Sequence, residues 1–345
     1  MSTSNISGDL SAGKKGISLL RWQARNPPAE PTTSFQGKTV LIIDADSSLG
    51  HQAAIKFAAL GASSLILGFR SIRKAEAAKL KIEKLTACQP SVIRTMLLDM
   101  STFSSVKSFA RQVSQEVETL DIALLNADFA SAGTKASPDG YEMSLQVNVL
   151  STALLGFLLL PKLRESAAKT GDKPHLVLMT SVAHVYVKAY QVPMGLLAGN
   201  HVPPDLWPKA QYGFVRLQAM YVAEALAHQA RKPNGELEFI VSVCDPGFCR
   251  SGIGHVSGWL LRHPVLLVHS FLARTAEQGS RTLVSATTLG EDSHGKLWSN
   301  DVFTRQDGLV QTKEGKKVQA KSWAEILEIV RKESSDVGAT LKLMS

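Results

Sequence analysis

Apolar residues follow two rhythms along this chain. Short, nearly unbroken apolar runs predict strands that are buried on both faces of a parallel sheet. Between these runs, apolar residues recur at the spacing of one helical face, which predicts covering helices. The predicted strands are Thr39–Ile43, Ser64–Gly68, Val92–Leu98, Ile122–Leu125, His175–Thr180 and Phe239–Val243. The predicted helices include 53–61, 73–85, 104–116, 141–164 and 211–229.

Strands that alternate with helices in this way predict an α/β fold, a doubly wound parallel sheet of the Rossmann type, in a single domain. We expect an N-terminal arm over 1–35, the main domain over 36–300 and a C-terminal extension over 301–345 that packs on the same domain. A last helix, predicted at 321–332, closes the fold.

Two segments lie outside the alternation. The arm carries Leu19, Leu20 and Trp22 ahead of a proline cluster, and we expect these three side chains to dock on the main domain. The segment 259–272 is strongly apolar but is interrupted by charged residues and a proline. We interpret it as a lid over an apolar substrate, with contact to a membrane surface as the alternative.

Composition narrows the class of protein. The apolar share is 44% and the charged share 20%, as in soluble globular chains, and no apolar run reaches the length of a membrane span. We expect no signal peptide and a cytoplasmic location. The three cysteines, Cys88, Cys244 and Cys249, lack disulfide or zinc spacing, and we expect the last two to pack in or near the core.

The net charge of +8 raises the question of an anionic partner. The basic clusters are not interleaved with stacking aromatic residues, and no nucleic-acid-binding signature is present. We therefore expect no nucleic-acid partner. Most of the basic residues from Arg70 to Lys84 form a solvated helix face, with Arg70 as the candidate exception.

The stretch from Lys38 to Leu60 organises the chain. A buried strand, a short polar loop and a helix N-terminus follow one another directly. This layout holds a dinucleotide pyrophosphate on backbone N–H groups and on the helix dipole. The loop is nevertheless short of the glycines that such a site normally contains.

Several segments, taken together, resemble the short-chain dehydrogenase/reductase family, most closely its fungal secondary-metabolism subgroup. The similarity runs from about Gly37 to the end of the chain. The segments that carry it are Leu67-Gly-Phe-Arg70, Lys74-Ala-Glu-Ala-Ala-Lys79, Leu98-Asp-Met-Ser101, Leu160-Pro-Lys-Leu-Arg164, Asp245-Pro-Gly-Phe-Cys-Arg-Ser251, Ala273–Val284 and His294-Gly295.

The resemblance implies a catalytic set. The family's tyrosine falls on Tyr212 and its basic partner, normally lysine, on Arg216, four residues later on the same helix face. Ser181 matches the serine that holds the substrate oxygen, and Asn148 matches the asparagine that supports a proton-relay water. We expect the cation to lower the pKa of the tyrosine, which then exchanges a proton with a carbonyl or alcohol oxygen.

The resemblance also implies an NADP(H) site. Arg70 follows the second strand, where an arginine rather than an acid favours a 2′-phosphate. Asp99 matches the residue at the adenine ring, Asn126 the asparagine after strand four, and Ser251 a contact near the nicotinamide amide. The full set of predicted cofactor-binding residues is Leu49, Gly50, Arg70, Lys74, Asp99, Asn126, Tyr212, Arg216 and Ser251.

Four positions depart from the family pattern. In the glycine motif, Asp44 and Ser48 replace two of the three glycines. Asp128 replaces the glycine of Asn-Ala-Gly, and Arg216 replaces the catalytic lysine. Asp44 adds a carboxylate where a pyrophosphate would bind, and arginine cannot act as a compact ammonium.

The leading prediction is an NADP(H)-dependent reductase or dehydrogenase that acts on a hydrophobic carbonyl or alcohol, in secondary-metabolite biosynthesis. The alternatives are a redox-neutral family member that catalyses isomerisation, dehydration or cyclisation with a vestigial cofactor site, and a catalytically inactive family member. The triplet Asp44-Ala-Asp46 lacks a third ligand, so we expect no metal site. The family's long helices imply a homodimer or homotetramer, unless the arm and lid cover that surface.

Overall fold

One eight-stranded sheet forms the centre of the protein. The computed structural model describes residues 16–130, 135–187, 209–250, 272–304 and 308–340. The strand order is β3-β2-β1-β4-β5-β6-β7-β8, with all neighbours parallel except β7 and β8. This confirms the predicted doubly wound sheet. The strands are β1 (Thr39–Ile42), β2 (Ser64–Phe69), β3 (Ile93–Leu97), β4 (Ile122–Leu125), β5 (His175–Met179), β6 (Ile240–Asp245), β7 (Leu297–Ser299) and β8 (Val302–Thr304).

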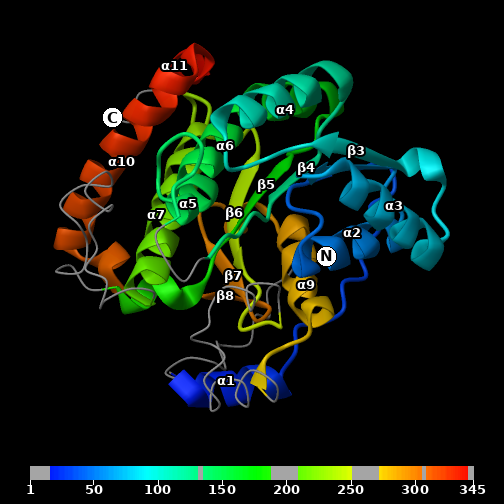
Figure 1. Ribbon diagram of the computed structural model, residues 1–345, viewed down its shortest axis with the longest axis horizontal. Coiled ribbons are helices and arrows are strands. Elements are labelled where there is room, and N and C mark those ends of the chain that lie inside the picture. The colour runs from blue at the N-terminus through cyan, green and yellow to red at the C-terminus, as the bar shows by residue number, and fades with distance from the viewer. Residues whose placement is uncertain (1–15, 131–134, 188–208, 251–271, 305–307, 341–345) are drawn as a thin grey trace.

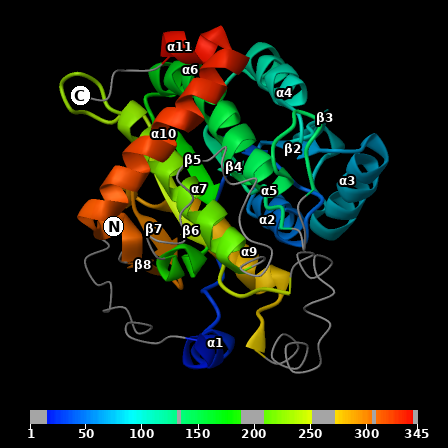
Figure 2. The ribbon, with the colours of Figure 1, turned by 60° about the vertical axis from the view of Figure 1, so that its left-hand side comes forward.

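Helices cover both faces of the sheet (Figure 1). One face carries α2 (Ser48–Ala59), α3 (Ile72–Thr86) and α9 (Ala276–Ser285), and the other carries α4 (Phe103–Glu116), α6 (Thr152–Thr170) and α7 (Lys209–Gln229). Outside α6 and α7 lie α10 (Lys313–Glu333) and α11 (Ser335–Thr340), as Figure 2 shows. The short helix α5 (Met143–Leu145) precedes α6, and α1 (Gly16–Arg25) lies at the bottom of Figure 1, below α9.

The first strand shows why the sheet is buried on both sides. Leu41 and Ile43 belong to the core under α4, α6 and α7, whereas Val40 and Ile42 belong to the core under α2, α3 and α9. All four side chains are fully buried. Successive side chains of a strand point to opposite faces, so an uninterrupted apolar run fills both cores.

Among the elements near the C-terminus, the sequence pattern missed β7, β8, α9 and α11. Strands β7 and β8 have only three residues each, which is too short for a recognisable periodicity. β7 becomes a strand because it pairs with the end of β6, and Trp298 and Phe303 then meet edge to face at 5.2 Å. The third element, α9, is short and begins with a capping box at Thr275 and Gln278.

The long apolar helix predicted over 141–164 begins at Met143 and continues to Thr170. Within it, the segment η2 (Gln146–Ser151) has π-helical hydrogen bonding. By length and composition Met143–Thr170 could cross a membrane, yet 94% of its most apolar window is buried inside the protein. Such burial is expected of a core helix that packs on the sheet.

The N-terminal arm contacts the main domain through the buried polar side chain of Gln23. Leu19, Leu20 and Trp22 are only partly buried, whereas Gln23 is 2% exposed. Gln23 Oε1 accepts a hydrogen bond from Phe248 N at 3.3 Å. Docking of the arm through Leu19, Leu20 and Trp22 stays a prediction, and the Gln23 contact satisfies a backbone N–H group of the loop after β6.

The buried guanidinium of Arg274 ties the arm to this same loop. It donates to the carbonyl oxygens of Gln23, Asn26 and Pro246 at 3.3, 2.8 and 3.2 Å. It also donates to Asn300 Oδ1 at 2.7 Å. One side chain therefore joins the arm, the loop after β6 and the turn between β7 and β8.

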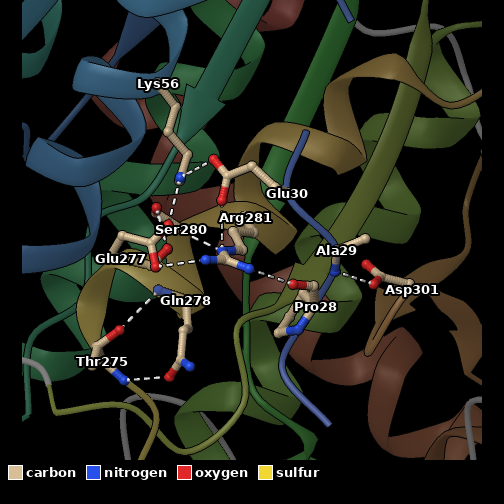
Figure 3. Close-up of polar contacts among 10 residues, drawn as sticks. All are labelled: Pro28, Ala29, Glu30, Lys56, Thr275, Glu277, Gln278, Ser280, Arg281 and Asp301. Carbon is tan, nitrogen blue, oxygen red and sulfur yellow. Dashed lines mark hydrogen bonds and ion pairs between the residues drawn. The ribbon is translucent and has the colours of Figure 1, made fainter. Parts of the chain in front are cut away.

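A second fastening holds the arm against α2 and α9 (Figure 3). Lys56 of α2 pairs with Glu30 of the arm and, at 2.6 Å, with Glu277 of α9. Arg281 contacts the same two carboxylates, at 2.9 and 3.0 Å, and donates to the carbonyl oxygen of Pro28 at 3.1 Å. The arm is thus held by charges on two helices that also pack on each other.

The division of the chain at residues 35 and 300 remains a prediction. The apolar segment 259–272 and Ser251 lie outside the described residues, apart from Leu272. Cys244 and Cys249 are buried in the core, as expected, and no cysteine forms a disulfide.

Candidate functional site

A pocket opens at the carboxyl ends of the first four strands. Ligands bind at this edge of doubly wound sheets, where the strand order reverses between β1 and β4. Four carboxylates and two cations belong to its lining. These are Asp44, Asp46, Asp99, Asp128, Arg70 and Lys135.

The loop after β1 keeps the backbone conformation of the first motif glycine, although Asp44 stands in its place. Asp44 has φ +54°, in the left-handed region that short polar residues such as Asp tolerate. Ser47 N donates to the Asp44 carbonyl oxygen at 3.0 Å, and Ala45 N donates to Gly68 O at 3.2 Å. The turn is therefore preserved although its first glycine is lost.

The carboxyl group of Asp44 is shielded from water and faces the pocket. Burial, reinforced by the nearby charge of Asp46, raises the pKa of Asp44 to about 6. The cations Arg70 and Lys74 and a hydrogen bond with Ser47 oppose this shift. Asp44 is therefore partly protonated near pH 6 and mostly ionised at neutral pH.

Gly50 is the one motif glycine retained, and the structure shows why. A Cβ at this position would lie 2.5 Å from the Asp44 carbonyl oxygen and 2.8 Å from Asn126 Nδ2. Ser47 caps α2 by accepting from Gly50 N, and Asn126 Nδ2 donates to the same hydroxyl at 3.0 Å. Gly50 thus lets the helix start against the loop.

Leu49 does not reach the pocket with its side chain. It is 5% exposed and packs in the core between α2 and α9, where a Cβ on Gly279 would lie 2.8 Å from Leu49 Cδ2. Only its backbone N–H, in the first turn of α2, is placed for a ligand. The assignment of Leu49 to the cofactor site stays a prediction, which only its backbone could fulfil.

Arg70 and Lys74 differ in their surroundings. Arg70 follows β2, lines the pocket and is exposed. Lys74, on α3, forms an ion pair with Asp46 at 2.8 Å. Asp46 Oδ1 is buried and has no hydrogen-bond partner among the described residues. Lys74 is thus held by Asp46, and Arg70 is the cation at this end of the pocket that is more available to a ligand.

Asp99 follows β3 and Asn126 follows β4. Asp99 lines the pocket, and its Oδ1 accepts from Ser101 N at 2.9 Å. Asn126 is fully buried and supports the glycine loop through Ser47, while its Oδ1 has no hydrogen-bond partner among the described residues. Ser251, the remaining predicted cofactor contact, cannot be placed because it lies outside those residues.

Tyr212 and Ser181 come together, as the family pattern requires. Ser181 precedes the short helix η3 (Val182–Tyr186), and a hydrogen bond joins its side chain to Tyr212 on α7. Burial nevertheless raises the pKa of Tyr212 to about 12, with smaller contributions from Asp245 and Cys249. The expected lowering of this pKa by Arg216 does not occur in this structure.

Arg216 lies on the same face of α7, with its guanidinium carbon 4.9 Å from the centroid of the Tyr212 ring. Its Nη2 forms an ion pair with Asp128 Oδ1. The two side chains are 1% and 9% exposed. Removal from water lowers the pKa of Arg216 below its usual value, but a guanidinium stays protonated in proteins and the Asp128 carboxylate stabilises its charge.

Asn148 supports the loop that carries Asp128. In the π-helical segment η2, its Oδ1 accepts from Phe129 N at 2.8 Å and its Nδ2 donates to Phe129 O at 2.7 Å. The amide therefore acts in this structure as a backbone clamp on the residue that follows Asp128. The water-supporting role implied by the resemblance remains a prediction.

Sequence reasoning missed Asp245 and the partner of Asp128. Asp245 is a fully buried carboxylate at the end of β6, where it accepts from Gly247 N and Ser299 Oγ, both at 3.1 Å. No local signal marks it, because its partners come from a turn and from a strand too short to predict. Asp128 and Arg216 were each noted as departures, but 88 residues separate them.

The residues present fit a nicotinamide dinucleotide, with the opposing charges of Asp44 and Asp46. Gly50 allows the close approach of the α2 N-terminus to the loop after β1, which a Cβ would prevent, and Arg70 supplies a cation beyond β2. Asp44 opposes a pyrophosphate when it is ionised. For metals, the described ranges contain no group of three His, Cys, Asp or Glu side chains that could hold an ion.

Comparison with known proteins identifies the family. The short chain dehydrogenase family model matches residues 38–192. The short-chain dehydrogenase/reductase ffsI of Aspergillus flavipes is 43% identical over 94% of this chain and 95% of its own length. The short-chain dehydrogenase/reductase phmF of Phaeosphaeria nodorum is 42% identical over 95% and 96%.

Solved structures share the fold at lower identity. An uncharacterised protein from Mycobacterium paratuberculosis matches with a TM-score of 0.59 and 22% identity, over 90% of this chain and 97% of that one. The NADP complex of Pseudomonas aeruginosa RhlG matches with a TM-score of 0.59 and 19% identity, over 81% and 98%. With these folds and relatives, the chain belongs to the short-chain dehydrogenase/reductase family of oxidoreductases.

Proposed function

We propose that this protein is an NADP(H)-dependent reductase or dehydrogenase of a hydrophobic carbonyl or alcohol. The observation that carries the proposal is the cluster of Tyr212, Ser181 and Arg216, which Asp128 joins to the pocket at the sheet edge. Carbonyl reduction requires a proton donor beside a bound dinucleotide, and a phenol next to a dinucleotide-type pocket meets this requirement.

The chain's own residues handle the proton and the orientation of the substrate. A bound nicotinamide would supply or accept the hydride. Tyr212 Oη holds the proton that neutralises the developing alkoxide, and Ser181 Oγ shares the same oxygen through a hydrogen bond. In the direction of alcohol oxidation, Tyr212 would have to lose that proton first.

Preference for NADP(H) over NAD(H) is part of the proposal. Arg70 lines the pocket just after β2, where a guanidinium suits a 2′-phosphate and an acid would suit a ribose hydroxyl. The NADP complex of RhlG and that of a short chain dehydrogenase from Shigella flexneri share this fold. Lys74 contributes less because it is paired with Asp46.

The fungal origin of the two relatives with 42% and 43% identity supports a role in secondary-metabolite biosynthesis. The apolar segment 259–272 supports a hydrophobic substrate. A cytoplasmic location, a homodimer or homotetramer and the absence of a nucleic-acid partner remain predictions.

The second candidate function is redox-neutral chemistry with a vestigial cofactor site. The observation in its favour is Asp44, a largely buried carboxyl group at the place of the first motif glycine. Tyr212 and Ser181 would then promote isomerisation, dehydration or cyclisation. A catalytically inactive member is the remaining alternative, which the retained Tyr212–Ser181 hydrogen bond disfavours.

Nucleotide binding by calorimetry tests the proposal. We expect micromolar NADPH affinity, much weaker NADH affinity, and loss of most of this difference in Arg70→Gln. Arg73→Gln is the matched control, because Arg73 is an exposed arginine three residues away that does not line the pocket. Undetectable binding of both nucleotides at millimolar concentration would overturn the proposal and favour redox-neutral chemistry.

Replacement of the phenol tests the catalytic part. Tyr212→Phe should lower NADPH consumption with apolar ketones by about 10²–10⁴-fold while nucleotide affinity persists. Tyr221→Phe is the control, since Tyr221 is buried on the same helix and its hydroxyl, among the described residues, hydrogen-bonds only to Gly315 O, at 3.4 Å. Equal turnover by Tyr212→Phe and the wild type would show that Tyr212 is not the proton donor.

A further inference from the structure

Two departures from the family pattern meet in space. Asp128, in the place of a glycine after β4, forms a buried ion pair with Arg216, in the place of the lysine on α7. Neither replacement can be understood without the other. Asp128 without a partner would be a shielded carboxylate, and Arg216 without a partner would be a buried cation.

Asp128 is held in position from two sides. Its loop is fixed by Asn148, which makes two hydrogen bonds, at 2.8 and 2.7 Å, to the backbone of the next residue, Phe129. Its carboxylate then reaches α7 at Arg216. A rigid backbone therefore presents the carboxylate to the guanidinium.

Arg216 depends on this contact. Its side chain is 1% exposed, and its Nε–H has no hydrogen-bond acceptor among the described residues. Besides Asp128, Asp245 acts on it through its charge at longer range. The guanidinium also lies over the Tyr212 ring, so any change in its position or net charge is felt by the phenol.

We infer that Asp128 is the positioning residue of this site, which holds Arg216 against the ring of Tyr212, offsets its charge and so keeps Tyr212 in the proton-donating form. The inference rests on the proposed function only in taking Tyr212 as the acid. The inference treats the two departures as one unit. Replacing only one of them by the residue usual in the family should therefore disturb the protonation of Tyr212.

The other groups that face Tyr212 stay constant in the test. They are Ser181 from the segment before η3, Asp245 from β6 and Cys249 from the loop after β6. Ser181 lowers the pKa of Tyr212 through its hydrogen bond, and the other two raise it. A change on replacing Asp128 therefore reports the Asp128–Arg216 pair.

The ionisation of Tyr212 can be measured without cofactor or substrate. The phenolate absorbance of each protein during an alkaline titration is compared with that of its Tyr212→Phe counterpart. In Asp128→Asn the freed guanidinium should stabilise the phenolate and lower the titration midpoint by about one pH unit or more. Glu116→Gln, which disrupts the surface pair with Arg94, is the control and should leave the midpoint unchanged.

An unchanged midpoint in Asp128→Asn would overturn the inference. If that variant does not fold, the double variant Asp128→Gly with Arg216→Lys provides the same comparison, because it removes the carboxylate and keeps a cation. It too should titrate below the wild type. A midpoint equal to that of the wild type would again count against the pair.

A double-mutant cycle on thermal stability gives an independent readout. Asp128→Asn and Arg216→Gln should each lower the unfolding temperature, and the double variant should lose clearly less than the sum of the two losses. Additive losses would show that the two residues do not act as a unit. Neither experiment uses NADPH, so failure of the proposed function would leave both results readable.

Discussion

Lys74 Nζ lies 2.8 Å from Asp46 Oδ2, so a carboxylate of the glycine loop holds the first lysine of α3. The family pattern assigns Lys74 to the cofactor, but the structure gives it a prior partner in the same pocket. The loop after β1 has thus gained an acid that offsets a cation after β2. Cofactor affinity in this chain depends on that balance.

Removing the acid should tighten NADPH binding. Asp46→Asn takes a negative charge from the pocket and frees Lys74, and one such charge at ~6 Å with an effective dielectric of ~20 is worth roughly 2–3 kcal/mol before solvent screening. Because Lys74 is half exposed, we expect a gain of about tenfold, with a smaller gain for NADH.

Calorimetry with both nucleotides measures this gain. Glu83→Gln is the matched control, because Glu83 contacts Lys79 on the same helix, does not line the pocket and should leave affinity unchanged. Equal NADPH affinities of Asp46→Asn and the wild type would show that the ion pair does not limit binding.

Asp44 should make folding stability depend on pH. Its folded pKa, about 6, lies above the ordinary 3.8, so between these values the folded state binds more protons than the unfolded state. Stability therefore falls as pH rises through this window. A shift of about two units corresponds to roughly 3 kcal/mol, fully lost above about pH 7.

The variant Asp44→Asn isolates this effect, because Asn also tolerates positive φ. Chemical denaturation at about pH 4 and about pH 8 should show the Asn variant gaining on the wild type by up to about 3 kcal/mol at the higher pH. A stability difference independent of pH would mean that the Asp44 carboxyl titrates normally.

Gly50 should not accept a side chain. In Gly50→Ala the new methyl group meets the Asp44 carbonyl oxygen at 2.5 Å, so the loop or the helix must move, at a cost of about 1–3 kcal/mol. Gly338→Ala is the control, since it is a helical position with nothing within 4 Å of the added Cβ.

We expect Gly338→Ala to be neutral or to stabilise by about 0.5 kcal/mol. Denaturant titration of both variants measures the two free energies of unfolding. Similar values for the two variants would contradict the close approach at Gly50.

Lys56 should fasten the arm. Lys56→Met leaves Glu30 and Glu277 without their shared, 10% exposed cation, and we expect a loss of about 1–2 kcal/mol, because the carboxylates themselves are partly exposed. Limited trypsin digestion should then cleave faster after Arg25, an exposed residue at the end of α1.

Lys173→Met is the matched control, because Lys173 forms a surface pair with Glu291 that is far more exposed. It should change neither stability nor cleavage measurably. Unaltered cleavage in Lys56→Met would show that the contacts of Arg274 and Arg281 are sufficient to hold the arm.

The elements that the pattern predicted correctly are those with a strong local signal. The strand that begins at Thr39 is apolar at every position facing either core, so burial on both sides could be read directly. Tyr212 and Arg216 could be placed on one helix face because four residues make about one turn. β7 escaped prediction because three residues become a strand only beside β6.

Six of the eight strands, most of the covering helices, the family and the candidate acid could be predicted from the amino-acid sequence, because they depend on periodicity and on motifs within short stretches. Which charges meet depends on how the folded chain brings distant segments together. The fold joins Asp128 to Arg216, Asp46 to Lys74, and Lys56 to Glu30 and Glu277. Ion pairs between distant segments leave no periodic pattern in the sequence. Their effect on a pKa depends on distance and burial, and both are known only from the folded structure.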